Sequence, residues 1–317
     1  MRKINYCLLI FFTFCFGTYS CKNNSSNEEK DTPTKGKIVI AVDESFEPIV
    51  SELVSSFESE YPKAKIIIQY LPESQCIEKL LNDSVRLAIV CRELTNAEKE
   101  IFKPMGYEPA IIPIAVDALA FINNLQNEDS TLTYNQVQQI LGGQISYWNE
   151  LDKNMPHEKI NLIFDQSNSS ALRYLKDSVN HGNPLPVNCF ASDSSQGVIN
   201  YIVDHSDAIG VIGVNWINSK LDSTTEANFE KVKMIKVKPL PGMPGDSSFH
   251  APVPYNIAYR HYPFLRVVYI VSREYYTGLG TGFANYCATD KGQTIISRSG
   301  MLPVNKSLRV VTINPNF

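Results

Sequence analysis

Short polar stretches lie at four points where an apolar, strand-like run gives way to a helical pattern: "DESFEP" (43–48), "LPESQC" (71–76), "SNSSAL" (167–172) and "SDSSQGV" (192–198). The first turn of a helix offers unpaired backbone N–H groups and the positive end of the helix dipole, which together suit an anion. The same residue types also cap helices without any ligand. Each stretch alone is therefore a helix cap or an anion site, and two such stretches in each half of the chain favour the anion site.

Three charged residues lie close to these helix starts. Arg92 follows an apolar run and could bind an oxyanion through both arms of its guanidinium, or form a surface ion pair with Glu93. Glu73 and Asp165 would repel a fully ionised oxyanion, but each could accept a hydrogen bond from a protonated one such as hydrogen phosphate. This pattern favours phosphate over sulfate. Asp165 is equally open to a simpler interpretation, as an acid favoured by the helix dipole.

The sequence contains no recognisable catalytic motif. It lacks the G-x-S-x-G elbow, the H-E-x-x-H zinc motif and the P-loop. Its histidines have no metal-ligand spacing, and no pair of acids stands out as catalytic; the histidines are His157, His181, His205, His250 and His261. We therefore predict no catalytic residues, no metal and no cofactor, and we predict that the protein is not an enzyme.

Apolar runs alternate with helical patterns along the chain, which is typical of an α/β fold with parallel strands. Residues 37–43, 64–71 and 85–94 are predicted strands, and 46–57 and 73–83 are predicted helices between them. A second alternation follows in the middle of the chain. It consists of predicted strands at 161–164, 187–191, 208–214 and 231–238, with helices from about 170 and at 197–205.

Two long extended segments, 110–124 and 255–272, bracket this second α/β unit. Each is too long for an ordinary strand, so we predict that each crosses between two lobes. The prediction places 37–115 and 262–317 in lobe 1 and 116–261 in lobe 2, with one closing helix over 281–297.

The whole chain has 317 residues, of which 44% are hydrophobic and 20% charged, with a formal net charge of −4. This composition predicts a globular protein and argues against a nucleic-acid partner. Residues 1–20 begin with basic residues and continue with an apolar run, which is typical of an export signal. The small residues before Cys21 are similar to a lipobox, so we predict lipidation of Cys21 and a lipid-anchored place in the cell envelope, with plain secretion as the alternative. Residues 21–36 are a predicted polar tether.

Once the leader is set aside, the cysteines that remain are Cys76, Cys91, Cys189 and Cys287. They lack the spacing of a metal site. Four buried free thiols are the preferred interpretation, and a disulfide between Cys76 and Cys91 is the alternative in an exported protein.

Several segments together resemble the phosphate-binding proteins of ABC uptake systems. "YPFLRVVYIV" (262–271) followed by 280–304 is similar to the closing segment of that family. Residues 137–151, "VQQILGGQISYWNEL", resemble its helix, glycine and tryptophan corner, and 197–214 resemble the helix and strand before the second crossing. The resemblance covers about residues 37–304.

The family resemblance implies a two-lobed periplasmic-binding-protein-like fold of type II. It also implies a monomer that closes on phosphate or a related small oxyanion and delivers it to an ABC permease at the membrane. Carried over by position, Ser45 and Phe46 match the family's first phosphate contact, and 165–171 match its phosphate loop. The ligand-binding residues predicted from the helix starts and the resemblance together are Ser45, Phe46, Glu73, Ser74, Arg92, Asp165, Ser167, Asn168, Ser169 and Ser170.

The sequence departs from the family pattern within this loop. Asp165 stands where the family has an arginine, Ala171 where it has a threonine, and only Ser169 is retained. Arg92 could supply the missing positive charge, which keeps phosphate as the leading ligand. Two alternatives stay open: a protein of the same fold that binds a different, cationic or amide-bearing solute, and a surface phosphohydrolase.

Overall fold

The computed structural model describes residues 31–127, 130–221 and 223–305. The predicted signal peptide, Cys21 and most of the predicted tether lie outside these residues. The folded body begins at Asp31, before the predicted start at Lys37, because the Asp31 carboxylate is bound to the body. It accepts hydrogen bonds from the Tyr276 hydroxyl at 2.6 Å and from the Leu279 N–H at 2.6 Å.

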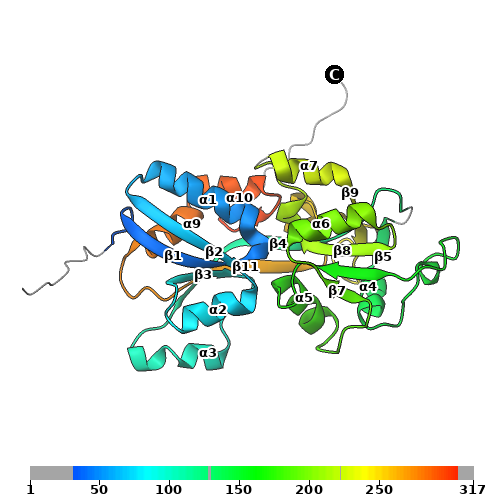
Figure 1. The fold of residues 1–317 in the computed structure, drawn as a ribbon, viewed down its shortest axis with the longest axis horizontal. Coiled ribbons are helices and arrows are strands. Elements are labelled where there is room, and N and C mark those ends of the chain that lie inside the picture. The colour runs from blue at the N-terminus through cyan, green and yellow to red at the C-terminus, as the bar shows by residue number, and fades with distance from the viewer. Residues whose placement is uncertain (1–30, 128–129, 222, 306–317) are drawn as a thin grey trace, which may run out of the picture. The chain divides into compact units, whose positions relative to one another are not determined.

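The first lobe contains a parallel three-stranded unit, in the order β2, β1, β3 (Figure 1). The predicted alternation of strands and helices is confirmed here, with the third strand shorter than expected. The elements of this lobe are β1 (Gly36–Asp43), α1 (Glu47–Glu60), β2 (Ala64–Leu71), α2 (Glu73–Leu81), β3 (Leu87–Val90), α3 (Asn96–Glu100), α9 (Leu279–Ala288), α10 (Asp290–Arg298) and β12 (Leu302–Pro303). A 3-10 turn, Glu44–Phe46, joins β1 to α1.

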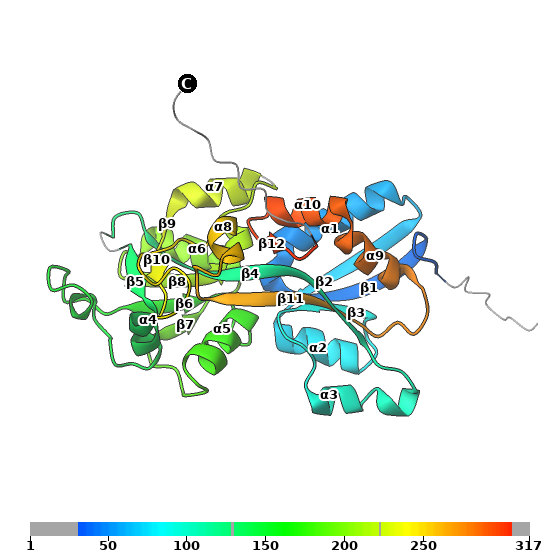
Figure 2. The same cartoon turned by 180° about the vertical axis from the view of Figure 1, so that it is seen from behind.

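Strand β4 (Ala110–Asn124) is the first link between the lobes, as the long apolar run predicted. Its first part pairs with β11 (Leu265–Ser272) over residues 110–118. Its second part pairs with β8 (Ala208–Gly213) from Leu119 onward. One sheet thus continues through both lobes, in the order β2-β1-β3-β11-β4-β8-β6-β7, and β4 and β11 run side by side between the lobes in both views (Figures 1 and 2).

The second lobe repeats the α/β arrangement, with β6 parallel to both β7 and β8. Its elements are β5 (Thr131–Thr133), α4 (Tyr134–Leu141), β6 (Asn161–Phe164), α5 (Ser170–Tyr174) followed by a π-helical turn (Leu175–Val179), β7 (Cys189–Ala191), α6 (Ser195–Asp204), α7 (Ser223–Lys231), β9 (Val232–Met234), β10 (Lys236–Lys238) and α8 (Pro254–Ala258). The assignment of the lobe boundaries to 115/116 and 261/262 stays a prediction.

Three sequence predictions are wrong in detail. The segment 255–272 is not extended throughout, because α8 occupies 254–258 with Pro254 in its first turn, where proline favours a helix. The closing helix is two helices, since Thr289 ends α9 and its hydroxyl caps α10 by accepting from the Gly292 N–H at 3.3 Å. The charged strand 231–238 is divided between β9, which pairs with β4, and β10, which pairs with β5.

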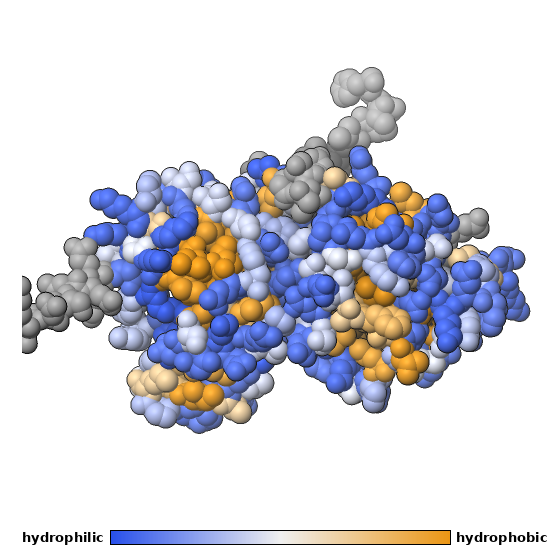
Figure 3. Space-filling model, viewed as in Figure 1, coloured by the Kyte–Doolittle hydropathy of each residue, from blue (hydrophilic) through white to orange (hydrophobic). Residues whose placement is uncertain are grey.

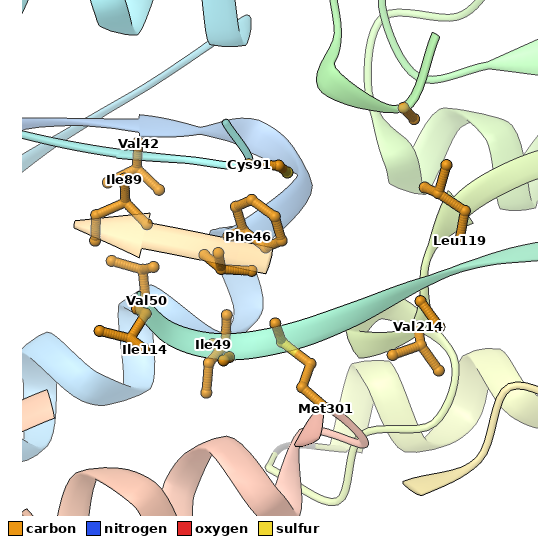
Figure 4. Close-up of a cluster of buried hydrophobic side chains, with 14 of the residues drawn as sticks. Val42, Phe46, Ile49, Val50, Ile89, Cys91, Ile114, Leu119, Val214 and Met301 are labelled. Carbon is orange, nitrogen blue, oxygen red and sulfur yellow. The ribbon is translucent and has the colours of Figure 1, made fainter. Parts of the chain in front are cut away.

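The largest hydrophobic core cluster includes residues of both lobes. Figure 4 shows Phe46, Ile49 and Val50 of the first lobe around one end of β4, and Leu119 and Val214 farther along toward the second lobe. On the face drawn in Figure 3, apolar patches lie over each lobe and the zone where the lobes meet is mainly hydrophilic. Continuous apolar packing beside a polar meeting zone suits two lobes that share a hinge and enclose a polar site.

All cysteines in the described part of the chain are free. The predicted free thiols are therefore confirmed, and the alternative disulfide between Cys76 and Cys91 is wrong. Cys76, Cys91 and Cys287 are buried, whereas Cys189 is only half-buried. Within residues 31–305, apart from the gaps stated above, no helix has the length and apolarity needed to span a membrane.

Candidate ligand-binding site between the lobes

The turn after β1 belongs to the first lobe and contacts the second lobe through Ser45. The Asp43 carboxylate shapes the turn by accepting a hydrogen bond from the Ser45 N–H at 3.1 Å. The Ser45 hydroxyl then donates to Asp165 Oδ2 at 2.9 Å. The Ser45 carbonyl accepts from Asn215 Nδ2 at 2.9 Å and from Trp216 Nε1 at 3.0 Å. Ser45 is thus a buried contact between the predicted first helix start and the predicted phosphate loop.

Arg266 is the buried cation at this junction. It lies on β11 opposite Asp117 of β4, and its Nε donates to Asp117 Oδ2 at 2.8 Å. Its Nη1 donates to the Ser170 hydroxyl at 2.7 Å. Its Nη2 is buried without a hydrogen-bond partner among the described residues. The guanidinium carbon lies 5.2 Å from the centre of the Phe46 ring, so the aromatic face also stabilises the charge.

Glu73 and Arg173 form an ion pair between the lobes. Glu73, at the start of α2, accepts from Arg173 Nε through Oε2 and from Arg173 Nη2 through Oε1 at 3.3 Å. Glu73 Oε1 also accepts from the Cys91 N–H at 2.9 Å. The Glu73 carboxylate is buried, whereas the Arg173 side chain is 30% exposed. The pair therefore closes the edge of the site with its cation toward solvent.

Glu44 occupies the start of α6 in the second lobe. Its Oε1 accepts from the Ser195 N–H at 2.9 Å and its Oε2 from the Ser195 hydroxyl at 3.1 Å. The helix start that the sequence marks as an anion site therefore binds a carboxylate of the protein itself. The Ser194 hydroxyl caps the same helix by accepting from the Gly197 N–H at 3.1 Å.

The buried acids outnumber the arginines around this site, and two of them have strongly raised pKa values. Burial, and then the neighbouring Glu73 carboxylate, raises the pKa of Asp43 to about 7 while Arg266 opposes the shift. Burial raises the pKa of Glu44 to about 8, against the hydrogen bond from the Ser195 N–H. Burial thus favours the neutral form of both side chains, which makes the site less hostile to an anion than its residue types suggest.

Asp165 lies in the site and not on the surface. Its side chain is buried, its Oδ2 accepts from Ser45, and its Oδ1 accepts from the Gln166 N–H at 3.0 Å. It does not face Arg92. Arg92 binds Glu98 through both arms of the guanidinium, at 2.7 Å each, and donates to the Glu93 carbonyl at 2.9 Å. A ligand contact by Arg92 stays a prediction, because it requires Glu98 to release the guanidinium.

The other predicted site residues fall into three positions. Ser169 caps α5 by accepting from the Leu172 N–H at 3.2 Å, and Phe46 is fully buried in the core. The exposed residues Ser74, Ser167 and Asn168 line an outer cavity of about 290 Å³ at the mouth of the junction. Charges of both signs line the same cavity: the cations are Arg92, Arg173 and Lys176, and the acids are Glu73 and Asp177.

Sequence reasoning missed the charged pair that organises the site. Asp117 and Arg266 each stand alone as the only charge in a long apolar strand, in "AVDALAF" and "FLRVVYIV". A lone charge in a buried strand requires a partner, and the two predicted crossings had to lie side by side. These two features of the sequence could have predicted the ion pair between Asp117 and Arg266. The contacts of Glu44 and Arg173 had no comparable signal, because each partner is remote in the sequence.

As a whole, the fold and the site define a class of protein in which two α/β lobes enclose a small polar ligand. Comparison with known proteins agrees. The family model described as "PBP superfamily domain" matches residues 27–291, and this chain belongs to that superfamily.

Curated relatives include PstS proteins, named as phosphate-binding proteins. PstS of Borreliella burgdorferi is 28% identical over 177 residues, which are 56% of this chain and 57% of the relative. PstS of Pseudomonas aeruginosa is 21% identical over 259 residues, which are 77% of this chain and 76% of the relative. The match thus spans little more than half the length of the first relative.

Solved structures show the same fold. A Clostridium perfringens protein, described as a phosphate ABC transporter substrate-binding protein with bound phosphate, has a TM-score of 0.71 at 22% identity. It covers 85% of this chain and 100% of its own. An ABC-type phosphate transport receptor from Vibrio cholerae has a TM-score of 0.63 at 18% identity, covering 84% and 100% of the two chains. The two-lobed fold predicted from the sequence is therefore confirmed.

Proposed function

We propose that this protein is a solute-binding protein that captures phosphate between its lobes and delivers it to an ABC permease. The observation that carries the proposal is Arg266, a buried guanidinium bonded to Ser170 of the second lobe, whose Nη2 has no hydrogen-bond partner among the described residues. A buried N–H donor without an acceptor is costly, and an anionic oxygen is its strongest acceptor. The relatives named as phosphate-binding proteins support the choice of phosphate.

Arg266 supplies the cation that the loop lacks. Asp165 replaces the arginine expected from the family resemblance. Strand β11 instead brings the Arg266 guanidinium to the start of α5, directly after this loop, where it donates to the Ser170 hydroxyl. The hydroxyls of Ser45 and Ser170 lie 3.5 Å apart at this point, one from each lobe. A bound oxyanion would accept hydrogen bonds from both hydroxyls and from Arg266, and would so hold the lobes together.

Asp165 provides the basis for choosing hydrogen phosphate. Its Oδ2 accepts a hydrogen bond from the Ser45 hydroxyl and could accept one from a protonated ligand in the same place. Sulfate carries no proton at neutral pH, so it would meet the carboxylate with an unprotonated oxygen. The site should therefore bind phosphate and reject sulfate.

The setting of the protein belongs to the same proposal. Lipidation of Cys21, a monomeric state and a place in the cell envelope fit a subunit that supplies a membrane permease. Binding without catalysis fits the site, because in the described part of the chain the Ser45 and Ser170 hydroxyls bond to Asp165, to Arg266 and to each other, and none of these partners is a histidine that could activate a hydroxyl. Hydrolysis of a simple phosphoester by the purified protein would favour the surface phosphohydrolase instead.

Titration calorimetry of the full chain with phosphate and with sulfate tests the proposal. We expect saturable heat with phosphate and none with sulfate. Ser170→Ala should weaken phosphate binding by at least about tenfold, since a hydrogen bond to a charged group is worth about 1.5–3 kcal/mol. Arg86→Gln is the matched control, because Arg86 is an ion-paired arginine of the first lobe bound to Asp31 and Glu274. No heat with phosphate at millimolar concentration would refute phosphate capture.

A second candidate ligand is a cationic or amide-bearing solute. The excess of buried acids around Ser45 favours it; these acids are Asp43, Glu44, Glu73, Asp117 and Asp165. A thermal-shift screen separates the two candidates, because a ligand of the native state raises the melting temperature by mass action. A shift with a polyamine or an amide, and none with phosphate, would select the second candidate.

A further inference from the structure

Three buried side chains of the first lobe form a mixed oxygen and sulfur cluster beside the proposed phosphate site. They are Asp43, Glu73 and Cys91, and one ligand atom from each lies within 4.8 Å of the others. Their exposed fractions are 1%, 2% and 7%. Carboxylate oxygens and a cysteine sulfur at this spacing can converge on one metal ion with small side-chain movements.

The strand register brings these residues together. Val42 of β1 lies opposite Ile89 of β3, so Asp43, which ends β1, and Cys91, which follows β3, lie at the same edge of the sheet. Glu73 begins α2, and its Oε1 is fixed there by the Cys91 N–H at 2.9 Å. Arg173 of the second lobe holds the same carboxylate from outside. The cluster is therefore positioned by the backbone before any ligand binds.

Asp43 points to an additional ligand. Its Oδ1 accepts from the Ser45 N–H, but its Oδ2 is buried with no hydrogen-bond partner among residues 31–305 as described. A carboxylate oxygen removed from water without a partner is strongly unfavourable. In Figure 4 the Cys91 side chain lies near Phe46, at the turn that follows Val42. The Asp43 carboxyl group, which carries this unpaired oxygen, and the Cys91 thiol are therefore neighbours, with one ligand atom of each within 4.8 Å of the other.

We propose that Asp43, Glu73 and Cys91 bind a divalent transition-metal ion, of which Zn²⁺ is the representative. A thiolate ligand excludes Mg²⁺ and Ca²⁺, which take oxygen ligands, and two carboxylates with one thiolate suit an ion of intermediate softness. Binding replaces the thiol proton of Cys91, which is released to solvent, so no redox step is involved. Three protein ligands leave a position for water or for an oxyanion oxygen.

Acids outnumber arginines around the cluster, although Arg266 lies close enough to act on both Asp43 and Cys91. The buried acids of the junction are compensated by Arg266 and by the half-exposed Arg173. A divalent ion at Asp43 would offset the remaining negative charge, and an oxyanion bound by Arg266 Nη2 could take its open position. The metal site does not require phosphate to be the ligand, and it is tested without phosphate.

The test is a titration of the full chain with Zn²⁺ alone, after chelator treatment and dialysis, in competition with a chromophoric chelator. We expect one ion per chain. Cys91→Ser and Asp43→Asn should each weaken binding by at least about tenfold, because even residues that only support metal ligands contribute about 10–100-fold. Cys189→Ser is the matched control, since this half-buried thiol lies on β7 of the other lobe.

Cobalt(II) provides a direct readout of the sulfur ligand. The Co²⁺ form of the unchanged protein should show a thiolate-to-metal charge-transfer band, and Cys91→Ser should lose it while Cys189→Ser keeps it. Thermal unfolding of each variant shows whether it is folded. If Asp43→Asn does not fold, Cys91→Ser alone decides the test, because it changes only one atom. The proposal is overturned if the folded protein binds no stoichiometric Zn²⁺, or if binding and the band are unchanged in Cys91→Ser.

Discussion

At the scale of single residues, the Asp117–Arg266 pair places a buried arginine at the junction, whereas the family resemblance predicts an arginine at the position of Asp165. Both side chains are almost fully buried, with exposed fractions of 0% and 3%. Burial raises the pKa of Asp117, and Arg266 opposes that shift. A buried ion pair contributes little net stability because desolvation costs nearly as much as the attraction supplies. A role in ligand binding therefore explains the pair better than stability does, because Asp117 holds Arg266 so that Nη2, which has no hydrogen-bond partner among the described residues, stays at the junction.

Removing one partner of this pair should be far more harmful than removing both. Arg266→Leu leaves Asp117 buried and uncompensated, at a cost of about 3–5 kcal/mol in the free energy of unfolding. The double variant Arg266→Leu with Asp117→Leu should recover most of that loss, yet bind no phosphate. Urea unfolding and calorimetry measure the two effects. A double variant that still binds phosphate would remove Arg266 from the site.

At the scale of elements, the helix starts identified in the sequence have different roles. Those of α5 and α6 are capped by their own serines, Ser169 and Ser194. In addition, α6 binds the Glu44 carboxylate across the lobes. A helix start can therefore be both a cap and an anion site. The capping serine uses one backbone N–H, and the other unpaired N–H groups of the first turn are left for an anion.

Helix α3 shows how a predicted ligand residue serves a helix start instead. Thr95 and Glu98 form a capping box, in which Glu98 Oε2 accepts from the Thr95 N–H at 2.7 Å. Arg92 binds the same carboxylate. Its hydrogen bonds are the largest influence that lowers the pKa of Glu98, from 4.5 to about 2.

This lowered pKa predicts a pH-dependent contribution to stability. Because the carboxylate is favoured in the folded state, its contribution is present above pH 4.5 and is lost as the pH falls toward about 2. Glu98→Gln should cost about 1–2 kcal/mol at pH 6 and almost nothing near pH 2. Urea unfolding at both values checks this, with Glu100→Gln on the same helix as the control. An equal cost at both values would contradict it.

At the scale of the whole folded body, the two lobes are joined by strands and held by side chains. Strands β4 and β11 provide the continuous link, and contacts of Glu44, Ser45 and Glu73 fasten the first lobe to the second. The lobes are therefore held together by polar contacts, which ligand binding can strengthen, while the linking strands are apolar apart from the Asp117–Arg266 pair. Such a division is what a reversible clamp requires.

Trp216 should report this closure. Its indole N–H donates to the Ser45 carbonyl across the junction, whereas Trp148 donates to Asp207 within the second lobe. The chain has 2 tryptophans, so the fluorescence excited selectively in tryptophan has 2 sources. We expect phosphate to change the emission of the protein, and Trp216→Phe to abolish the change while Trp148→Phe keeps it. The prediction fails if the change follows Trp148.

The sequence by itself determined the local elements and the kind of fold. Apolar runs marked β2, β4 and β6 at their observed bounds; β6 and the second part of β4 are buried, whereas β2 alternates buried and exposed residues at its start. The polar helix starts and the family resemblance marked Ser45, Asp165 and Ser170, which do meet at the junction. Only the tertiary structure decided the partners of the charged residues: Arg92 lies with Glu98, Arg173 with Glu73, and Arg266 with Asp117 and Ser170. Local patterns follow from neighbours in sequence, whereas the pairs of Arg173 and Arg266 join remote segments that meet only in the folded body. Arg92 and Glu98 are six residues apart, but it is the start of α3 that brings Glu98 beside Arg92.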